Sequence, residues 1–215
     1  MRINKYVAAA TGLSRRAADT AIAAGKVYVN GIVATAGQDV TSNDTVTLNS
    51  QSVHAPTTHQ TIMLNKPVGY VVSRDGQGSK TIYDLLPPEL HNLKPVGRLD
   101  KYSSGLLLMT TDGQLAQQLT HPSYQKEKIY EVTLDKPLAS EDSTRIEQGV
   151  MLEDGISKLR ITPQSGASYT IRMHEGRNRQ IRRTFAALGY TVTQLHRTHF
   201  SDYILMGQPG SYTVL

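Results

Sequence analysis

Residues 94–113 read Lys-Pro-Val-Gly-Arg-Leu-Asp-Lys-Tyr-Ser-Ser-Gly-Leu-Leu-Leu-Met-Thr-Thr-Asp-Gly. One carboxylate, Asp100, stands among turn-forming residues shortly before the apolar run Leu106–Met109. The run is typical of a buried strand, whereas the glycines and serines around Asp100 favour a loop. A loop in this position can present an acid to a cleft, and the neighbouring Arg98 is expected to help keep it ionised. The alternative is that Asp100 only forms an Asx-turn or a cap.

Composition sets the class of protein. The chain has 215 residues, of which 39% are hydrophobic, which predicts one medium globular domain with a small appended module. Cysteine is absent, so disulfides, thiolate catalysis and cysteine-based metal sites are excluded, and a reducing cytoplasm is the expected location. No apolar run approaches the roughly 20 residues that a membrane span needs, so we expect no membrane partner.

The positive charge is concentrated late in the chain. The formal net charge is +5. Between Arg172 and Arg197 there are six arginines and a single acid, Glu175. A basic segment of this kind favours an anionic partner such as RNA.

The first 50 residues have the pattern of a separate module. Apolar residues recur at helical spacing after Ile3, and Ser14 is placed to cap a second helix that ends near Gly25. A short strand then leads into Asn30-Gly31, the strongest two-residue hairpin signal. We therefore predict a small α/β domain over residues 1–50, a polar linker over 51–60 and a larger domain over 61–215.

Two further motifs lie in the larger domain. Residues 128–134 alternate like a strand, so Lys128 and Tyr130 are expected on the same face, although a tyrosine there can equally be a core residue. Residues 175–189 are expected to form a turn and then a helix closed by glycine. Arg179, Arg182 and Arg183 would share one helical face, which favours anionic partners over a merely solvated basic face.

Several motifs resemble those of one enzyme family. They are Asn-Lys-Pro at 65–67, Gly-Arg-Leu-Asp at 97–100, Lys-x-Tyr at 128–130, Glu-Gly-Arg-Asn-Arg-Gln-Ile-Arg-Arg at 175–183 and Leu-x-Arg at 195–197. In this order they resemble the pseudouridine synthases of small-subunit and large-subunit ribosomal RNA. Residues 1–50 resemble the S4-like RNA-binding domain. The residues Ser14-Arg15-Arg16 and Val29-Asn30-Gly31 of the N-terminal module resemble the large-subunit branch more than the small-subunit branch.

The resemblance implies a fold, an activity and site residues. The fold is α+β, with a mixed, mostly antiparallel sheet in the catalytic domain. The activity is isomerisation of a uridine in ribosomal RNA to pseudouridine, by a protein expected to be a monomer that needs no cofactor or metal. Asp100 is implied as the catalytic residue, Arg182 as its ion-pair partner and Tyr130 as a contact of the base that helps to remove a proton. The implied substrate and RNA contacts are Arg98, Lys128, Arg177, Arg179, Arg183, Leu195, Arg197, Arg15, Arg16 and Lys26.

Two other functions remain open on the sequence alone. The chain could be a non-catalytic ribosomal RNA-binding assembly or recycling factor, but such a binder has no use for a carboxylate facing phosphates. It could also be another RNA enzyme that shares the N-terminal module, but it lacks a nucleotide-binding Gly-rich signature. The pair His196 and His199 has no third ligand at a suitable spacing, so a zinc site is not expected.

Overall fold

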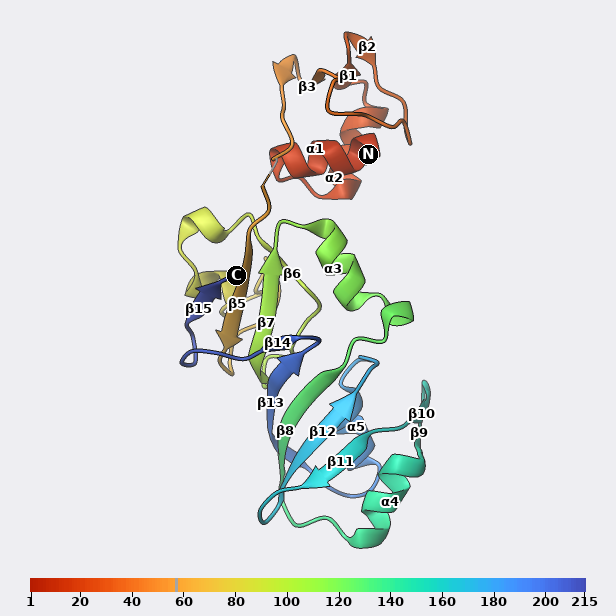
Figure 1. Cartoon of the computed structure of the whole chain (residues 1–215), viewed down its shortest axis with the longest axis vertical. Helices are drawn as coiled ribbons and strands as arrows, with labels where there is room; N and C mark the ends of the chain where they lie inside the picture. The colour runs from red at the N-terminus through yellow and green to blue at the C-terminus, as the bar shows by residue number, and fades with distance from the viewer. Residues whose placement is uncertain (57) are drawn as a thin grey trace. The chain divides into compact units, whose positions relative to one another are not determined.

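The structure is a computed structural model that describes residues 1–56 and 58–215. The chain divides into two compact units, Met1–His59 and Gln60–Leu215 (Figure 1). The first unit contains two helices and a four-stranded antiparallel sheet in the order β2-β1-β3-β4. Its elements are α1 (Ile3–Thr11), α2 (Arg15–Ala23), β1 (Val27–Val29), β2 (Ile32–Val33), β3 (Val46–Leu48) and β4 (Gln51–Ser52).

Local sequence signals explain most of this unit. The Ser14 hydroxyl accepts a hydrogen bond from the Ala17 backbone N–H at 3.0 Å, as expected of an N-cap. Asn30 and Gly31 have positive φ values of 52° and 81°, the conformation that a two-residue hairpin turn between β1 and β2 requires. The predicted helices and hairpin are therefore confirmed.

The predicted linker began too early. Gln51–Ser52 forms β4, which pairs with β3 across Asn49 and Ser50, two residues with positive φ. This second hairpin was missed because Asn-Ser is a weaker turn signal than Asn-Gly. Thr57, which the predicted linker also includes, lies outside the described residues.

A nine-stranded sheet forms the centre of the second unit. Its order is β11-β12-β8-β13-β7-β5-β15, with β14 added to β13 and β6 added to β7. The pair β13–β7 is parallel and the other pairs are antiparallel, so the predicted mixed, mostly antiparallel sheet is confirmed. The strands are β5 (Thr61–Lys66), β6 (Lys94–Pro95), β7 (Ser104–Thr110), β8 (Lys128–Leu134), β11 (Arg160–Pro163), β12 (Ser168–Met173), β13 (Val192–Phe200), β14 (Tyr203–Ile204) and β15 (Tyr212–Val214).

Helices and a separate hairpin pack around this sheet. Ile146 of α4 and Phe185 of α5 belong to the largest core cluster, whereas Leu119 of α3 belongs to a second cluster with Leu106 and Leu108 of β7. Alternate residues of β7 thus enter different clusters, which explains its uninterrupted apolar run. The remaining elements are α3 (Gly113–Thr120), α4 (Ser140–Gln148), α5 (Gln180–Ala186), the hairpin β9 (Val150–Leu152) and β10 (Gly155–Ser157), and the 3-10 turns η1 (Ile82–Leu85), η2 (Pro88–Leu90) and η3 (Pro122–Tyr124).

The junction of β7 and β13 requires a glycine. Gly105 has a φ of 102°, and a Cβ built there would overlap the backbone of Arg197. This close approach places the start of β7, immediately after the Asp100 loop, beside Arg197. Among the described residues, no helix combines the length and apolarity needed to cross a membrane.

Candidate active site

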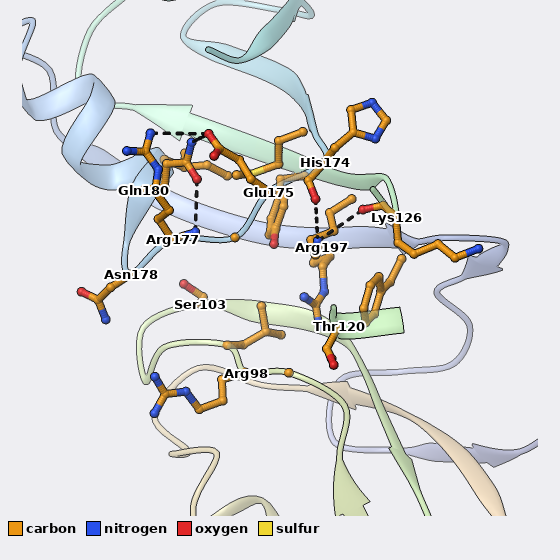
Figure 2. Close-up of a pocket in the computed structure, with 18 of the residues that line it drawn as sticks. Arg98, Ser103, Thr120, Lys126, His174, Glu175, Arg177, Asn178, Gln180 and Arg197 are labelled. Carbon is orange, nitrogen blue, oxygen red and sulfur yellow. Dashed lines mark hydrogen bonds and ion pairs between the residues drawn. The ribbon is translucent and has the colours of Figure 1, made fainter. Parts of the chain in front are cut away.

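A cavity of about 520 Å³ opens beside the Asp100 loop, and Figure 2 shows part of its lining. Its walls come from residues 97–103, the end of α3, β8, the loop after β12, and β13. Of the residues predicted for the site, it brings together Arg98, Asp100, Lys128, Tyr130, Arg177, Arg179, Leu195 and Arg197. Arg182 and Arg183 lie outside this lining, and Arg15, Arg16 and Lys26 are exposed residues of the first unit.

The backbone around Asp100 is held by Lys66, a fully buried residue at the end of β5. Its ammonium group donates hydrogen bonds to the carbonyls of Pro67 at 3.0 Å, Asp100 at 3.2 Å and Ser103 at 2.7 Å. Burial lowers the pKa of Lys66 to about 8, and the Asp100 carboxylate partly offsets this effect. The loop is therefore fixed both at Asp100 and three residues after it.

The sequence contained a signal for this role that the prediction did not use. Lys66 stands two residues after the apolar run Ile62–Leu64, on a strand that is buried from Ile62 onward. A lysine is rarely buried unless its charge is compensated. Its position therefore pointed to a dedicated set of oxygen partners.

The Asp100 carboxylate forms an ion pair with Arg179, at 3.8 Å between Oδ2 and Nη1, and its side chain is 35% exposed. The predicted pairing with Arg182 is wrong in this structure. Arg182 instead donates to the carbonyls of Tyr102 and Val192, each at 2.7 Å. Burial first, and then the charge of Arg179, lower the pKa of Arg182, whereas Asp100 raises it.

The error arose from treating the arginines as one regular helical face. Arg179 has a left-handed φ of 47° and precedes α5 as its N-cap residue, so its side chain does not follow the helical direction. Arg179 thus turns towards the acid. Arg182 links the Asp100 loop to β13 by binding the Tyr102 carbonyl.

Arg177 and Arg183 are engaged by the hairpin β9–β10. Arg183 binds both carboxylate oxygens of Asp154, at 3.0 Å and 2.7 Å, which is the bidentate geometry that suits a guanidinium group. Arg177 binds Asp154 as well, and also the carbonyls of Gly155 and Ile156. These contacts fix the loop that carries Arg179, and they occupy two arginines that were expected to bind RNA.

Tyr130 lies on the sheet wall of the cavity and is 8% exposed. It is directly opposite Arg197 on β13, and Lys128 is opposite Phe200. The prediction that Lys128 and Tyr130 share one face is therefore confirmed. Leu195 contributes an apolar surface to the same wall.

No group of three or more metal-binding side chains is placed to hold an ion within residues 1–56 and 58–215. His196 instead forms a hydrogen bond with the Ser104 hydroxyl at 2.8 Å, and His199 with the Thr198 hydroxyl at 2.9 Å. The arrangement therefore offers a carboxylate, a phenol and several cations around one cavity.

Lys66 should give the protein a distinctive dependence of stability on pH. Between its folded pKa of about 8 and the ordinary lysine value of about 10.4, the unfolded chain retains a proton that the folded protein has lost. The free energy of unfolding should therefore rise with pH in this window, by about 1 kcal/mol per unit. In urea unfolding, Lys66→Met should reduce the slope by about 1 kcal/mol per unit and leave the similar contribution of Lys128, whose pKa is also lowered to about 8, whereas Lys136→Met should keep the full wild-type slope. Parallel pH dependence of the wild type and Lys66→Met would refute the assignment.

The contacts of Asp154 predict coupling between the hairpin and α5. Asp154→Asn and Arg183→Met should each lower the thermal unfolding midpoint, because each breaks the same bidentate ion pair. The loss in the double variant should be smaller than the sum of the two single losses, because both substitutions remove the same Arg183–Asp154 pair, although Asp154→Asn also removes the contact with Arg177. Scanning calorimetry of all four proteins checks this, and losses that simply add would show that the pair does not hold the hairpin.

Comparison with known proteins places the chain in a family. Residues 60–187 match the family model for RNA pseudouridylate synthase, and residues 1–46 match that for the S4 domain. A solved structure described as a crystal structure of pseudouridylate synthase is 32% identical with a TM-score of 0.73, and the match covers 100% of this chain and 96% of that one.

Two curated relatives are both called ribosomal large subunit pseudouridine synthase B. The protein from Pseudomonas aeruginosa is 39% identical over 207 residues, which are 91% of this chain and 54% of that protein. The protein from Bacillus subtilis is 35% identical over 215 residues, which are 96% of this chain and 88% of that protein. The chain thus spans about half the length of the Pseudomonas relative. With the family match over most of residues 60–215, it belongs to the RNA pseudouridylate synthase family and carries an S4 domain at its N-terminus.

Proposed function

We propose that this chain is an RNA pseudouridine synthase, an isomerase that converts a uridine of large-subunit ribosomal RNA to pseudouridine. The observation that carries the proposal is the placement of the Asp100 carboxylate in a cavity that also contains Tyr130 and Leu195. Family membership and the names of the two curated relatives support the choice of reaction and of RNA.

The reaction makes modest demands on the protein. The bond between the ribose carbon C1′ and the uracil nitrogen N1 breaks, a new bond forms between C1′ and the ring carbon C5, C5 then loses its proton, and N1 gains a proton. No atom is added from outside and no electrons are exchanged, so this chemistry needs no cofactor. A carboxylate serves such a step as a nucleophile or by stabilising positive charge on the sugar.

The site supplies groups for each of these steps. Asp100 is kept near the sugar by the hydrogen bond from Lys66 to its backbone carbonyl, and its carboxylate pairs with Arg179. Tyr130 offers a ring that packs on uracil and a hydroxyl that can relay the proton leaving C5. Leu195 keeps one side of the base away from water.

The target uridine must leave its base stack to reach this cavity. A base inside a helix is inaccessible, so the enzyme acts on a loop or flips the nucleotide out. Arg98 and Lys126 line the cavity, and we assign them to the flanking phosphates. We further propose that the protein acts as a monomer in the cytoplasm.

The S4 domain provides a second RNA contact. Arg15 and Arg16 begin α2 and are exposed, as is Lys26 just before β1. Arginine at a helix N-terminus opposes the helix dipole, so a phosphate partner there improves the local electrostatics. We assign these three residues to the RNA backbone.

Substitution of Asp100 tests the proposed reaction. With ribosomal RNA tritiated at uracil C5, the wild type should release tritium from large-subunit RNA, and Asp100→Asn should release none while still binding. The exposed Asp202→Asn is the matched control and should retain full release. Binding by the wild type without any release would instead favour the assembly or recycling factor, and undiminished release by Asp100→Asn would remove Asp100 from the mechanism.

The salt dependence of binding tests the S4 domain. Each lost phosphate contact should reduce the slope of log K against log salt concentration by about one. Arg15→Gln with Arg16→Gln should therefore weaken binding to ribosomal RNA and reduce the slope by about two. Filter binding at four salt concentrations measures this, with Arg160→Gln as the control for a lost surface charge. An unchanged slope in the double variant would argue against these contacts.

A further inference from the structure

Two cations share the sheet wall of the cavity without an acidic partner. Lys128 on β8 and Arg197 on β13 both line it, and their charged groups lie 5.3 Å and 4.9 Å from the centre of the Phe200 ring. Among the described residues, neither cation forms an ion pair with a carboxylate. Burial first, and then the charge of Arg197, lower the pKa of Lys128 to about 8. The two charges therefore repel each other inside one pocket.

The guanidinium group of Arg197 is also incompletely hydrogen-bonded. Arg197 is only 2% exposed, and its Nε donates to the Leu106 carbonyl at 2.8 Å. Its Nη2 is buried and has no hydrogen-bond partner within the described residues. A buried donor on a charged group is costly to leave unpaired, so this nitrogen points to an acceptor supplied by a ligand.

Lys128 is only loosely held by the protein. Its ammonium group donates to the carbonyls of Lys126 and His174 at 3.3 Å and 3.2 Å. Both distances are long for a charged donor. An ammonium has three donors, so one remains for a ligand.

The acids of the cavity do not supply the missing charge. Asp100 is paired with Arg179. Glu175 is paired with Arg177 and also accepts a hydrogen bond from Gln180. The two carboxylates thus have their own partners on the loop before α5, and Lys128 and Arg197 are left for an external anion.

We propose that Lys128 and Arg197 form a phosphate subsite that binds a phosphodiester group of the nucleotide whose ribose reaches Asp100. The inference rests on the proposed function, since it takes the ligand to be RNA. A cavity of about 520 Å³ lies within the range of about 300–1,000 Å³ that is typical of small-ligand pockets. Because Arg197 is directly opposite Tyr130, the bound phosphate would lie beside the residue assigned to the base. The subsite thereby fixes the nucleotide by its phosphate while its base and sugar occupy the rest of the cavity.

The direct test compares uridine 3′,5′-bisphosphate with uridine, using the full chain and NMR of lysine side chains labelled at Cε. The wild type should bind the bisphosphate at least about tenfold more tightly than uridine, because charge-assisted hydrogen bonds to phosphate are strong. Lys128→Met should remove most of this preference without weakening uridine binding. Lys128→Arg should keep part of it, and Lys136→Met, which removes a lysine beside Tyr190, should keep all of it.

A measurement on the wild type alone guards against a variant that does not fold. The preference for the bisphosphate should fall between about pH 7.5 and about pH 9, as Lys128 loses its proton. Besides Arg197, the charged or titratable groups facing Lys128 across the cavity come from the loops and strands that line it: Asp100, His121, Lys126, Tyr130, His174 and Glu175, together with arginines that stay charged. Carboxyl, imidazole and phenol groups ordinarily titrate outside this window, and Lys66, which shares the pKa of about 8, is not part of the cavity lining.

Three results would overturn the subsite. They are equal affinity of the wild type for bisphosphate and uridine, no measurable binding of the bisphosphate, and equal weakening of both ligands by Lys128→Met, which is the result of a purely structural role. If these occur while wild-type tritium release persists, the subsite alone fails. If bisphosphate binding follows the expected pattern but no RNA is isomerised, the proposed function alone fails.

Discussion

The buried ammonium of Lys66 is the interaction on which the site depends. It lies at the end of β5 and donates to three carbonyls of the polypeptide that surrounds Asp100. Burial disfavours its charge, as the lowered pKa shows, so the hydrogen bonds must compensate a real cost. The result is an Asp100 loop whose backbone is fixed by the core of the sheet. The backbone of Asp100 is therefore held in place at the cavity, while its side chain remains partly exposed to solvent.

The arginines of the late basic segment divide into structural and ligand-facing groups. Arg177 and Arg183 hold the hairpin β9–β10 through Asp154, and Arg182 joins the Asp100 loop to β13. Arg179 faces the acid, and Arg197 has a donor left over inside the cavity. A cluster that looks uniform in sequence therefore serves three purposes. The number of arginines in this segment therefore overestimates how many of them are available to bind an anionic ligand such as RNA.

Features set by short-range rules were predictable from the sequence. The strand β7, the capped helix α2, the Asn30-Gly31 turn and the shared face of Lys128 and Tyr130 follow from apolar runs, capping and alternation. The partner of Asp100 was not predictable, because it depends on the left-handed backbone of Arg179. The anchoring by Asp154 and by Lys66 joins positions more than 20 residues apart in the chain. Such contacts leave no periodic trace in a single sequence.

The most direct test is a crystal structure of Asp100→Asn bound to a uridine-containing hairpin from large-subunit ribosomal RNA that the wild type modifies. We expect the target nucleotide to be turned out of its stack, with its ribose beside residue 100, its uracil against Tyr130 and the three hydrogen bonds of Lys66 intact. A uridine that stays stacked in the RNA, or RNA bound elsewhere with the cavity empty, would contradict the assignment of this cavity as the place of isomerisation.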